Sequence, residues 1–182
     1  MAYTDSGHAF YVLTFPGKAT FVYDAAMGEW HERETYGQLG WAATTYCRAY
    51  NKHLVGADTI NSLSLDVYAD KSNPLVSKVI SVPYGDNTDQ TIVMPRFQLD
   101  IETGVGATTG QGQTPQAMLR FSDDGGRNWS NELWEDFGAL GEYSARAVWW
   151  RLGSFRQRMI EVTISDPVKR AIMGGFAEIK NG

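Results

Sequence analysis

The sequence predicts an all-β protein made of antiparallel meanders. Aromatic residues make up 13% of the chain, and their bulky rings suit the half-buried surface of a pleated sheet. Short apolar runs recur along the chain, and they end at turn-forming residues such as Gly, Pro, Asn or Asp. No long segment repeats apolar residues at the spacing of an amphipathic helix.

The first apolar runs predict a meander of hairpins. Phe10 to Phe15 is an apolar run that stops at Pro16-Gly17. Thr20 to Tyr23 follows it, and Trp30 to Tyr36 comes next. Because tight loops separate these runs, we expect neighbouring antiparallel strands.

A second group of strands is expected in the following segment. Trp41 to Tyr50 is rich in aromatic and β-branched residues, and Asn51-Lys52 suggests a turn into His53 to Val55. From Asn61 to Tyr68, apolar and polar side chains alternate, which predicts one face toward a core. Cys47, the single cysteine, allows no internal disulfide, and we expect it to be a small buried side chain.

This rhythm of strands and turns resembles the blades of a β-propeller. The strands amount to about three four-stranded blades, and a closed propeller needs at least about four. Open blades would leave strand edges exposed. We therefore expect a single all-β domain over residues 1–182, either as a C-terminal fragment of a longer chain that contributes blades to a larger propeller, or in another β arrangement such as a sandwich.

The last third of the chain continues the pattern. Thr91 to Asp100 predicts a strand in which Pro95 marks an edge or a bulge. Residues 102–115 contain four glycines but no Gly-Lys-Ser/Thr ending, so we predict a mobile loop and not a nucleotide-binding loop. Further strands are expected at Gln116 to Phe121, Arg146 to Leu152 and Phe155 to Ser165.

One motif carries specific information. Ser122, Asp124, Gly126 and Trp129 match the pattern Ser-x-Asp-x-Gly-x-Thr-Trp, with Asn128 at the Thr position. The pattern resembles the Asp-box, a structural turn of sialidases and related propellers. In such a turn the Asp carboxylate accepts backbone N–H groups, Gly takes the positive φ, and Trp folds back onto the hairpin.

Other readings of the acidic residues are less favoured. Asp123 and Asp124 together suggest a cation site, but the segment lacks the alternating acids of a calcium loop. Glu132, Glu135 and Asp136 suggest paired glycosidase carboxylates, although a solvated acidic loop is far more common. We therefore predict no catalytic residue, no metal and no cofactor.

Charge limits the possible partners. The net charge is −5, whereas proteins that grip nucleic acid normally show a basic excess. A local basic cluster contains Arg146, Arg151, Arg156 and Arg158, which we expect to pair with acids or a partner subunit rather than with phosphates. No apolar stretch is long enough to span a membrane.

Successive tryptophans provide a second candidate surface. Trp149 and Trp150 must point to opposite faces of a strand. One ring is expected in the core and the other at a contact, either with sugar or with a subunit. The predicted subunit contacts are Arg146, Trp149, Trp150, Arg151 and Arg156.

Several segments resemble one known family. They are Gly7 to Pro16, Pro115 to Glu132, Gly138 to Tyr143, Arg151-Leu152-Gly153 and Ile164 to Lys169. Together they resemble the C-terminal portion of the packaged-DNA stabilisation proteins, also called tail hubs or tail accessory factors, of short-tailed phages.

The resemblance implies a structural component of the virion tail, assembled in the bacterial host cytoplasm. Such a component seals or extends the portal channel and retains packaged DNA without catalysis. It implies a homo-oligomeric ring, commonly a hexamer, with the portal-side tail adaptor and the tail needle or tailspike as partners. Neither sequence-specific nucleic-acid binding nor membrane binding is expected. The alternative is a glycan-binding or sialidase-like propeller domain, for which Arg146 and Tyr143 are the candidate pair.

Overall fold

A computed structural model describes residues 1–85 and 90–181, and every regular element in these residues is a β-strand. The chain divides into two compact units, 1–73 and 74–182, where we had expected one domain over 1–182. In the described residues no helix has the length and apolarity to cross a membrane.

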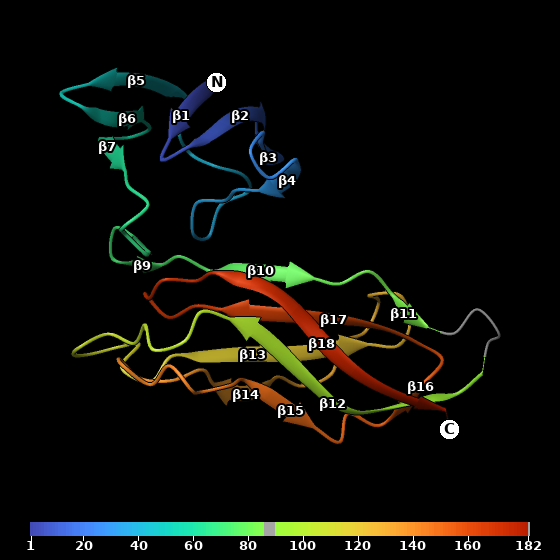
Figure 1. Ribbon diagram of the computed structural model, residues 1–182. Helices are drawn as coiled ribbons and strands as arrows, with labels where there is room; N and C mark the ends of the chain where they lie inside the picture. Colours follow the sequence, from blue (N-terminus) through green and yellow to red (C-terminus); the bar gives the residue numbers. More distant parts are fainter. Residues whose placement is uncertain (86–89, 182) are drawn as a thin grey trace. The chain divides into compact units, whose positions relative to one another are not determined.

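The first unit begins with the meander expected from the sequence. Its sheet has the order β1-β2-β3-β4, with every pairing antiparallel (Figure 1). The inner face of this sheet holds a small core of Tyr3, Phe10, Val12 and Val22. The strands are β1 (Ala2–Asp5), β2 (His8–Phe15), β3 (Ala19–Asp24) and β4 (Glu29–Glu32).

The second sheet of this unit is shorter than expected. Its strands are β5 (Thr45–Ala49), β6 (Lys52–Gly56) and β7 (Ile60–Leu63), followed by the short pair β8 (Ala69–Asp70) and β9 (Asn73–Pro74). Strand β5 begins four residues later than predicted, since Trp41 lies in a loop. The predicted strand from Asn61 to Tyr68 ends at Leu63 because the Ser64 hydroxyl accepts the Asp66 N–H at 3.2 Å, which bends the chain.

Cys47 corrects another expectation, because its side chain is exposed. It follows Tyr46, whose ring packs 5.6 Å from that of Tyr3 on the inner side. Successive side chains of a strand point to opposite faces, so Cys47 faces the solvent.

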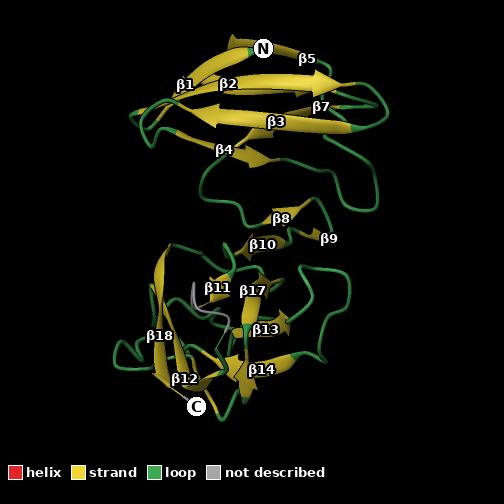
Figure 2. Cartoon of the chain, turned by 90° about the vertical axis from the view of Figure 1, so that its right-hand side faces the viewer, coloured by secondary structure: helices red, strands yellow, loops and turns green. Residues whose placement is uncertain are grey.

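The second unit is a β-sandwich. One sheet has the order β10-β17-β13-β14, and β11 also pairs with β17. The other has the order β15-β12-β16, and β18 also pairs with β12. Figure 1 shows β12 and β18 crossing in front of β13 and β17, and Figure 2 shows the two layers edge on. The strands are β10 (Ser77–Ile80), β11 (Tyr84–Gly85), β12 (Ile92–Ile101), β13 (Gln116–Ser122), β14 (Leu133–Asp136), β15 (Val148–Trp150), β16 (Ser154–Phe155), β17 (Gln157–Ile164) and β18 (Ile172–Asn181).

This arrangement differs from the predicted propeller blades. A blade is a meander of consecutive strands, whereas β17 inserts between β10 and β13, which lie far from it in the chain. The inner faces of both sheets enclose one apolar core, to which β12, β13, β15 and β17 contribute most of the buried side chains. The described strands of this unit therefore form a sandwich and not blades.

Strand β12 shows how the sequence pattern works inside the sandwich. Its side chains alternate between buried and partly exposed positions, and its pairing with β18 shifts register between Val93 and Arg96. The predicted bulge at Pro95 is therefore confirmed, although β12 is paired on both sides and is not an edge.

The glycine-rich segment 102–115 contains no strand, as predicted. It is nonetheless packed closely, because a Cβ atom at Gly106 would lie 2.6 Å from the Gln113 carbonyl oxygen. At Gly104, whose φ is +76°, a Cβ would lie 2.6 Å from the Tyr143 ring. Two glycines are thus required for close approach, and the mobility of the loop stays a prediction.

Candidate functional site

A buried arginine closes one end of the sandwich. Arg158 is in phase with the inward-facing Ile160 and Val162 of β17, and it is 2% exposed. Its guanidinium carbon lies 4.0 Å from the ring centroid of Phe121 and 4.1 Å from that of Phe155. Since Phe121 and Phe155 come from opposite sheets, the cation is held between the two layers.

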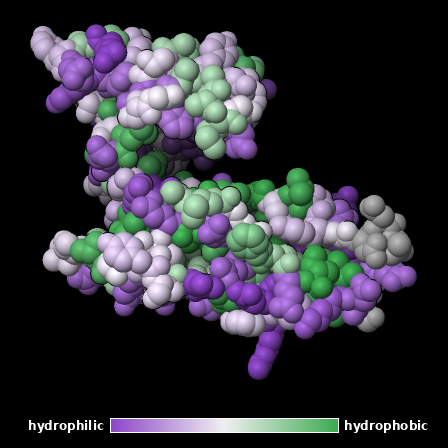
Figure 3. Space-filling model, viewed as in Figure 1, coloured by the Kyte–Doolittle hydropathy of each residue, from purple (hydrophilic) through white to green (hydrophobic). Residues whose placement is uncertain are grey.

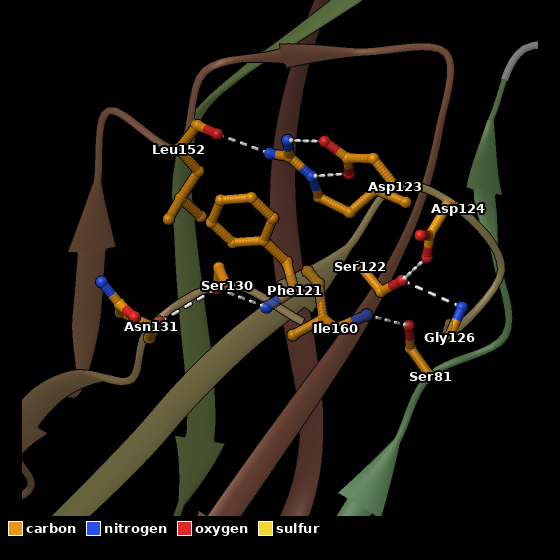
Figure 4. A network of polar contacts seen from close by, with 11 residues as sticks. Ser81, Phe121, Ser122, Asp123, Asp124, Gly126, Ser130, Asn131, Leu152 and Ile160 are labelled. Atoms are coloured by element: carbon orange, nitrogen blue, oxygen red, sulfur yellow. Dashed lines mark hydrogen bonds and ion pairs between the residues drawn. The ribbon is translucent and has the colours of Figure 1, made fainter. Parts of the chain in front are cut away.

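Asp123 neutralises this cation. Arg158 Nε donates to one carboxylate oxygen at 2.6 Å, and Nη2 donates to the other at 2.7 Å. Nη1 donates to the carbonyl of Leu152 at 2.5 Å. Figure 4 shows Asp123 and Leu152 near the Phe121 ring. The two-point ion pair ties the turn after β13 to β17, and the Nη1 bond ties β17 to the connection between β15 and β16.

The turn that follows Asp123 is organised by Asp124. One carboxylate oxygen accepts the backbone N–H groups of Arg127 and Asn128, each at 2.9 Å, and also the Ser122 hydroxyl at 2.8 Å. The Ser122 hydroxyl in turn accepts the Gly126 N–H at 2.9 Å (Figure 4). The hydrogen bonds donated to Asp124, first that of the Asn128 backbone N–H and then that of the Asn128 side-chain amide, lower the pKa of Asp124 from 3.8 to about 2.

Trp129 lies in the loop between β13 and β14. Strand β14 starts only at Leu133, because Ser130 is bound to the end of β13. The Ser130 N–H donates to the Phe121 carbonyl oxygen at 2.8 Å, and the Ser130 hydroxyl accepts the Phe121 N–H at 3.0 Å. The Trp129 ring lies 5.0 Å from the guanidinium carbon of Arg120. Arg120 also donates to Glu161, and this hydrogen bond raises the pKa of Arg120.

Replacement of Asp124 tests this turn. We expect Asp124→Ala to lower the midpoint of thermal unfolding by several degrees, since four donors lose their acceptor: one hydroxyl, two backbone N–H groups and the Asn128 side-chain amide. Asp124→Asn keeps the shape and removes the charge. Differential scanning calorimetry measures both variants, with the exposed turn residue Arg127→Ala as the matched control. An unchanged midpoint in Asp124→Ala would contradict the structural role.

The lowered pKa of Asp124 predicts that the stability of the fold depends on pH. Because the folded pKa of Asp124 lies below its ordinary 3.8, the ionised carboxylate stabilises the fold fully above about pH 4. That contribution disappears as the pH falls toward about 2. We expect the difference in melting temperature between the wild type and Asp124→Asn to be constant from pH 5 to 7 and to shrink steadily between pH 4 and 2. A difference of equal size at pH 6 and pH 2 would show that the charge is not involved.

The structure separates the two tryptophans predicted to contact subunits. Trp149 is 2% exposed, and its Nε1 donates to the carbonyl of Leu133 at 2.9 Å, so it belongs to the core and is not a contact residue. Trp150 is 63% exposed on the outer face. This confirms that one ring is in the core and leaves Trp150 available for a contact.

The predicted arginines are also at different positions. Arg146, Arg151 and Arg156 are all exposed, and Arg151 has a φ of 58° in the turn after β15. Arg158, the fourth arginine of the cluster, pairs with an acid as expected. Arg158 precedes Ile160 by two residues in β17, and the alternation of side chains in a strand therefore indicates that both face inward.

Trp150 belongs to a mixed aromatic and charged surface. The register of β15, β12 and β18 places Trp150, Arg96 and Glu178 in one row, with Gln98 and Phe176 in the next row on the same outer face. The Arg96 guanidinium carbon lies 5.5 Å from the Trp150 ring centroid, and Phe176 is 63% exposed. We call these five residues the Trp150 face. Figure 3 shows hydrophobic residues interspersed with hydrophilic ones on the side of this unit that carries β18.

Sequence reasoning missed Arg96 and Phe176. The alternation within β12 assigns Arg96 to the outer face, but the partner strand that brings Phe176 next to it comes from far along the chain. Strand pairing of this kind is not encoded in local periodicity.

The other candidate chemistry is not assembled into a site. Both acids of the proposed cation site are engaged by donors, Asp123 by Arg158 and Asp124 by its own turn. In residues 1–85 and 90–181 no group of three or more His, Cys, Asp or Glu side chains is placed to hold a metal ion. The sialidase pair, Arg146 and Tyr143, is exposed to solvent in the segment before β15.

The fold and the site together define a β-sandwich protein in which the organised polar side chains secure turns and join sheets. Residues 79–180 match the model of a protein family described as bacteriophage P22 Gp10, beta-sandwich. The match covers more than half of the chain and lies within the second unit, so the chain belongs to this family. It is a structural protein of the phage tail or head closure, and hence a virion component. No curated protein matches the chain.

Proposed function

We propose that this chain seals or extends the portal channel of a phage head and retains the packaged DNA, without catalysing a reaction. Membership of the phage family and the Trp150 face together carry this proposal. Tryptophan, phenylalanine and arginine on one exposed surface are the residue types enriched at protein interfaces.

Retention of DNA in this proposal acts through protein contacts. The chain has a net charge of −5, whereas a DNA grip would need a basic surface to neutralise phosphates. The protein therefore blocks the exit of DNA by closing a channel, and sequence-specific binding to the nucleic acid is not needed.

The assembly partners follow from the same proposal. A ring of identical subunits, a hexamer in the simplest case, fits a channel on a symmetry axis. The portal-side tail adaptor is the partner on one side, and the tail needle or tailspike is the partner on the other. Assembly takes place in the bacterial host cytoplasm, on heads that already contain DNA.

A DNA-retention assay tests the proposal. DNA-filled heads that carry the adaptor but lack later tail proteins are incubated with the full chain and then with nuclease. We expect the wild type to protect the DNA and Trp150→Ser to lose at least about tenfold in the concentration needed. Tyr143→Ser removes another exposed ring (77%, against 63% for Trp150) from outside the Trp150 face and is the matched control.

The outcomes separate the parts of the proposal. Absence of protection by the wild type contradicts the retention function. Protection by Trp150→Ser equal to that by the wild type contradicts the role of the Trp150 face. Analytical ultracentrifugation of the same variants shows whether any loss arises from self-assembly or from binding to the adaptor.

A further inference from the structure

The first unit contains a polar hollow that is independent of the Trp150 face. Its volume is about 420 Å³. The turn between β1 and β2 forms one wall, and two residues of the β5–β6 hairpin form the other. Its lining consists of residues 4–9 together with Arg48 and His53.

Two imidazoles in this lining are held in fixed orientations. His8 Nδ1 lies 2.6 Å from an Asp24 carboxylate oxygen, and the ring of His8 stacks on that of Phe10. His53 Nδ1 lies 2.8 Å from the hydroxyl of Tyr46, whose ring stacks on His53 at 5.9 Å. In both rings the protein engages Nδ1, so Nε2 is the nitrogen left for a ligand.

Arg48 adds a permanent positive charge. Its Nη2 makes a long hydrogen bond of 3.5 Å to Asn51, on an exposed part of the hairpin. A guanidinium has five N–H donors, and its fork matches the two oxygens of a carboxylate. Arg48 is therefore suited to bind an anionic group in two-point geometry.

The opposite wall has a different chemistry. Asp5 and Ser6, joined by a hydrogen bond of 3.0 Å, present a carboxylate and a hydroxyl beside Thr4. Such groups accept and donate hydrogen bonds to hydroxyl groups. One ligand that carries both an acid group and several neighbouring hydroxyls would satisfy both walls.

We propose that this hollow binds the acidic sugar of a saccharide, with its carboxylate on Arg48 and its hydroxyls on Asp5, Ser6 and the Nε2 atoms of the two imidazoles. A volume of about 420 Å³ accommodates one or two sugar rings. The open turn on one side lets a longer saccharide continue into solvent. The site gives the virion protein a binding function that is separate from channel closure.

The three histidines of the chain provide the test. Long-range ¹H–¹⁵N NMR spectra of the full chain follow each imidazole during titration with glucuronate, methyl glucoside and inorganic phosphate. We expect glucuronate to shift the resonances of His8 and His53 with one saturating curve. His31, on β4 and outside the hollow, is the internal reference.

Matched variants complete the test. Arg48→Gln is expected to weaken glucuronate binding about tenfold. Lys52→Gln removes the same charge from an exposed position in the same hairpin, outside the hollow, and is expected to change binding less than about twofold. Both variants should keep the melting temperature of the wild type, which shows that any loss is not due to unfolding.

Several results would overturn the proposal. These are equal shifts of all three histidines, unchanged affinity in Arg48→Gln, or equal losses in Arg48→Gln and Lys52→Gln. Phosphate binding as tight as that of glucuronate would mean a simple oxyanion site and would exclude the saccharide. None of these results bears on the DNA-retention assay, because the hollow and the Trp150 face lie in different units.

Discussion

Replacement of Trp149 by alanine is expected to destabilise the second unit by about 3–5 kcal/mol, the usual cost of removing a large aromatic side chain from a packed core. Trp149 is 2% exposed, and its ring lies 6.0 Å from that of Phe97. The substitution also removes the hydrogen bond to the carbonyl of Leu133, which links β15 to β14 across the two sheets. Urea denaturation, monitored by circular dichroism, measures the change in the free energy of unfolding.

The neighbouring tryptophan is the natural control. Trp150→Ala removes the same number of atoms one residue further along the strand, but from a side chain that is 63% exposed. We expect it to cost less than about 1 kcal/mol. Equal destabilisation by the two substitutions would contradict the assignment of the two rings to opposite faces of the sheet.

Removal of Asp123 is expected to cost about 3 kcal/mol, because it leaves a cation without its counter-charge in the core. Arg158 is 2% exposed in side-chain area, whereas Asp123 is 42% exposed. The arginine therefore cannot turn to water when its partner is lost. Urea denaturation of Asp123→Ala measures this cost, and Asp123→Asn separates the loss of charge from the loss of shape.

Because Arg158 is buried and Asp123 is partly exposed, replacement of one partner is expected to cost a different free energy of unfolding from replacement of the other. In Arg158→Met, an apolar chain of similar length fills the space between Phe121 and Phe155, and Asp123 becomes hydrated. We therefore expect Arg158→Met to destabilise the protein less than Asp123→Ala does. The opposite order would mean that stacking of the guanidinium between the rings, and not neutralisation of its charge, dominates the stability of this end of the sandwich.

The local pattern of the sequence determined several features of this protein. Apolar runs separated by turn residues predicted the all-β class and the meander of β2 and β3. Pro95 predicted an edge or a bulge, of which β12 has the bulge, and the adjacent tryptophans predicted one buried ring and one exposed ring. Each of these depends on residues within a few positions of each other, where dihedral preferences and the two-residue alternation of a strand act directly.

The candidate site shows which features the local sequence pattern does not predict. The alternation of β17 indicates that Arg158 faces inward, but only the pairing of β17 with β13 brings it to Asp123. The segment beyond Leu63 alternates like a strand but bends at Ser64, where the Ser64 hydroxyl accepts the Asp66 N–H and no strand of residues 1–85 and 90–181 pairs with the segment.

The strand order and the division into two units were decided by tertiary structure alone. In a meander each strand pairs with the next one along the chain, and this assumption led to the prediction of propeller blades. In the second unit the two layers instead join strands from distant parts of the chain, and this pairing encloses the apolar faces of β12, β13 and β17 in a common core. Burial of apolar surface is non-directional and depends on the whole sheet, so no short stretch of sequence specifies which strands become neighbours.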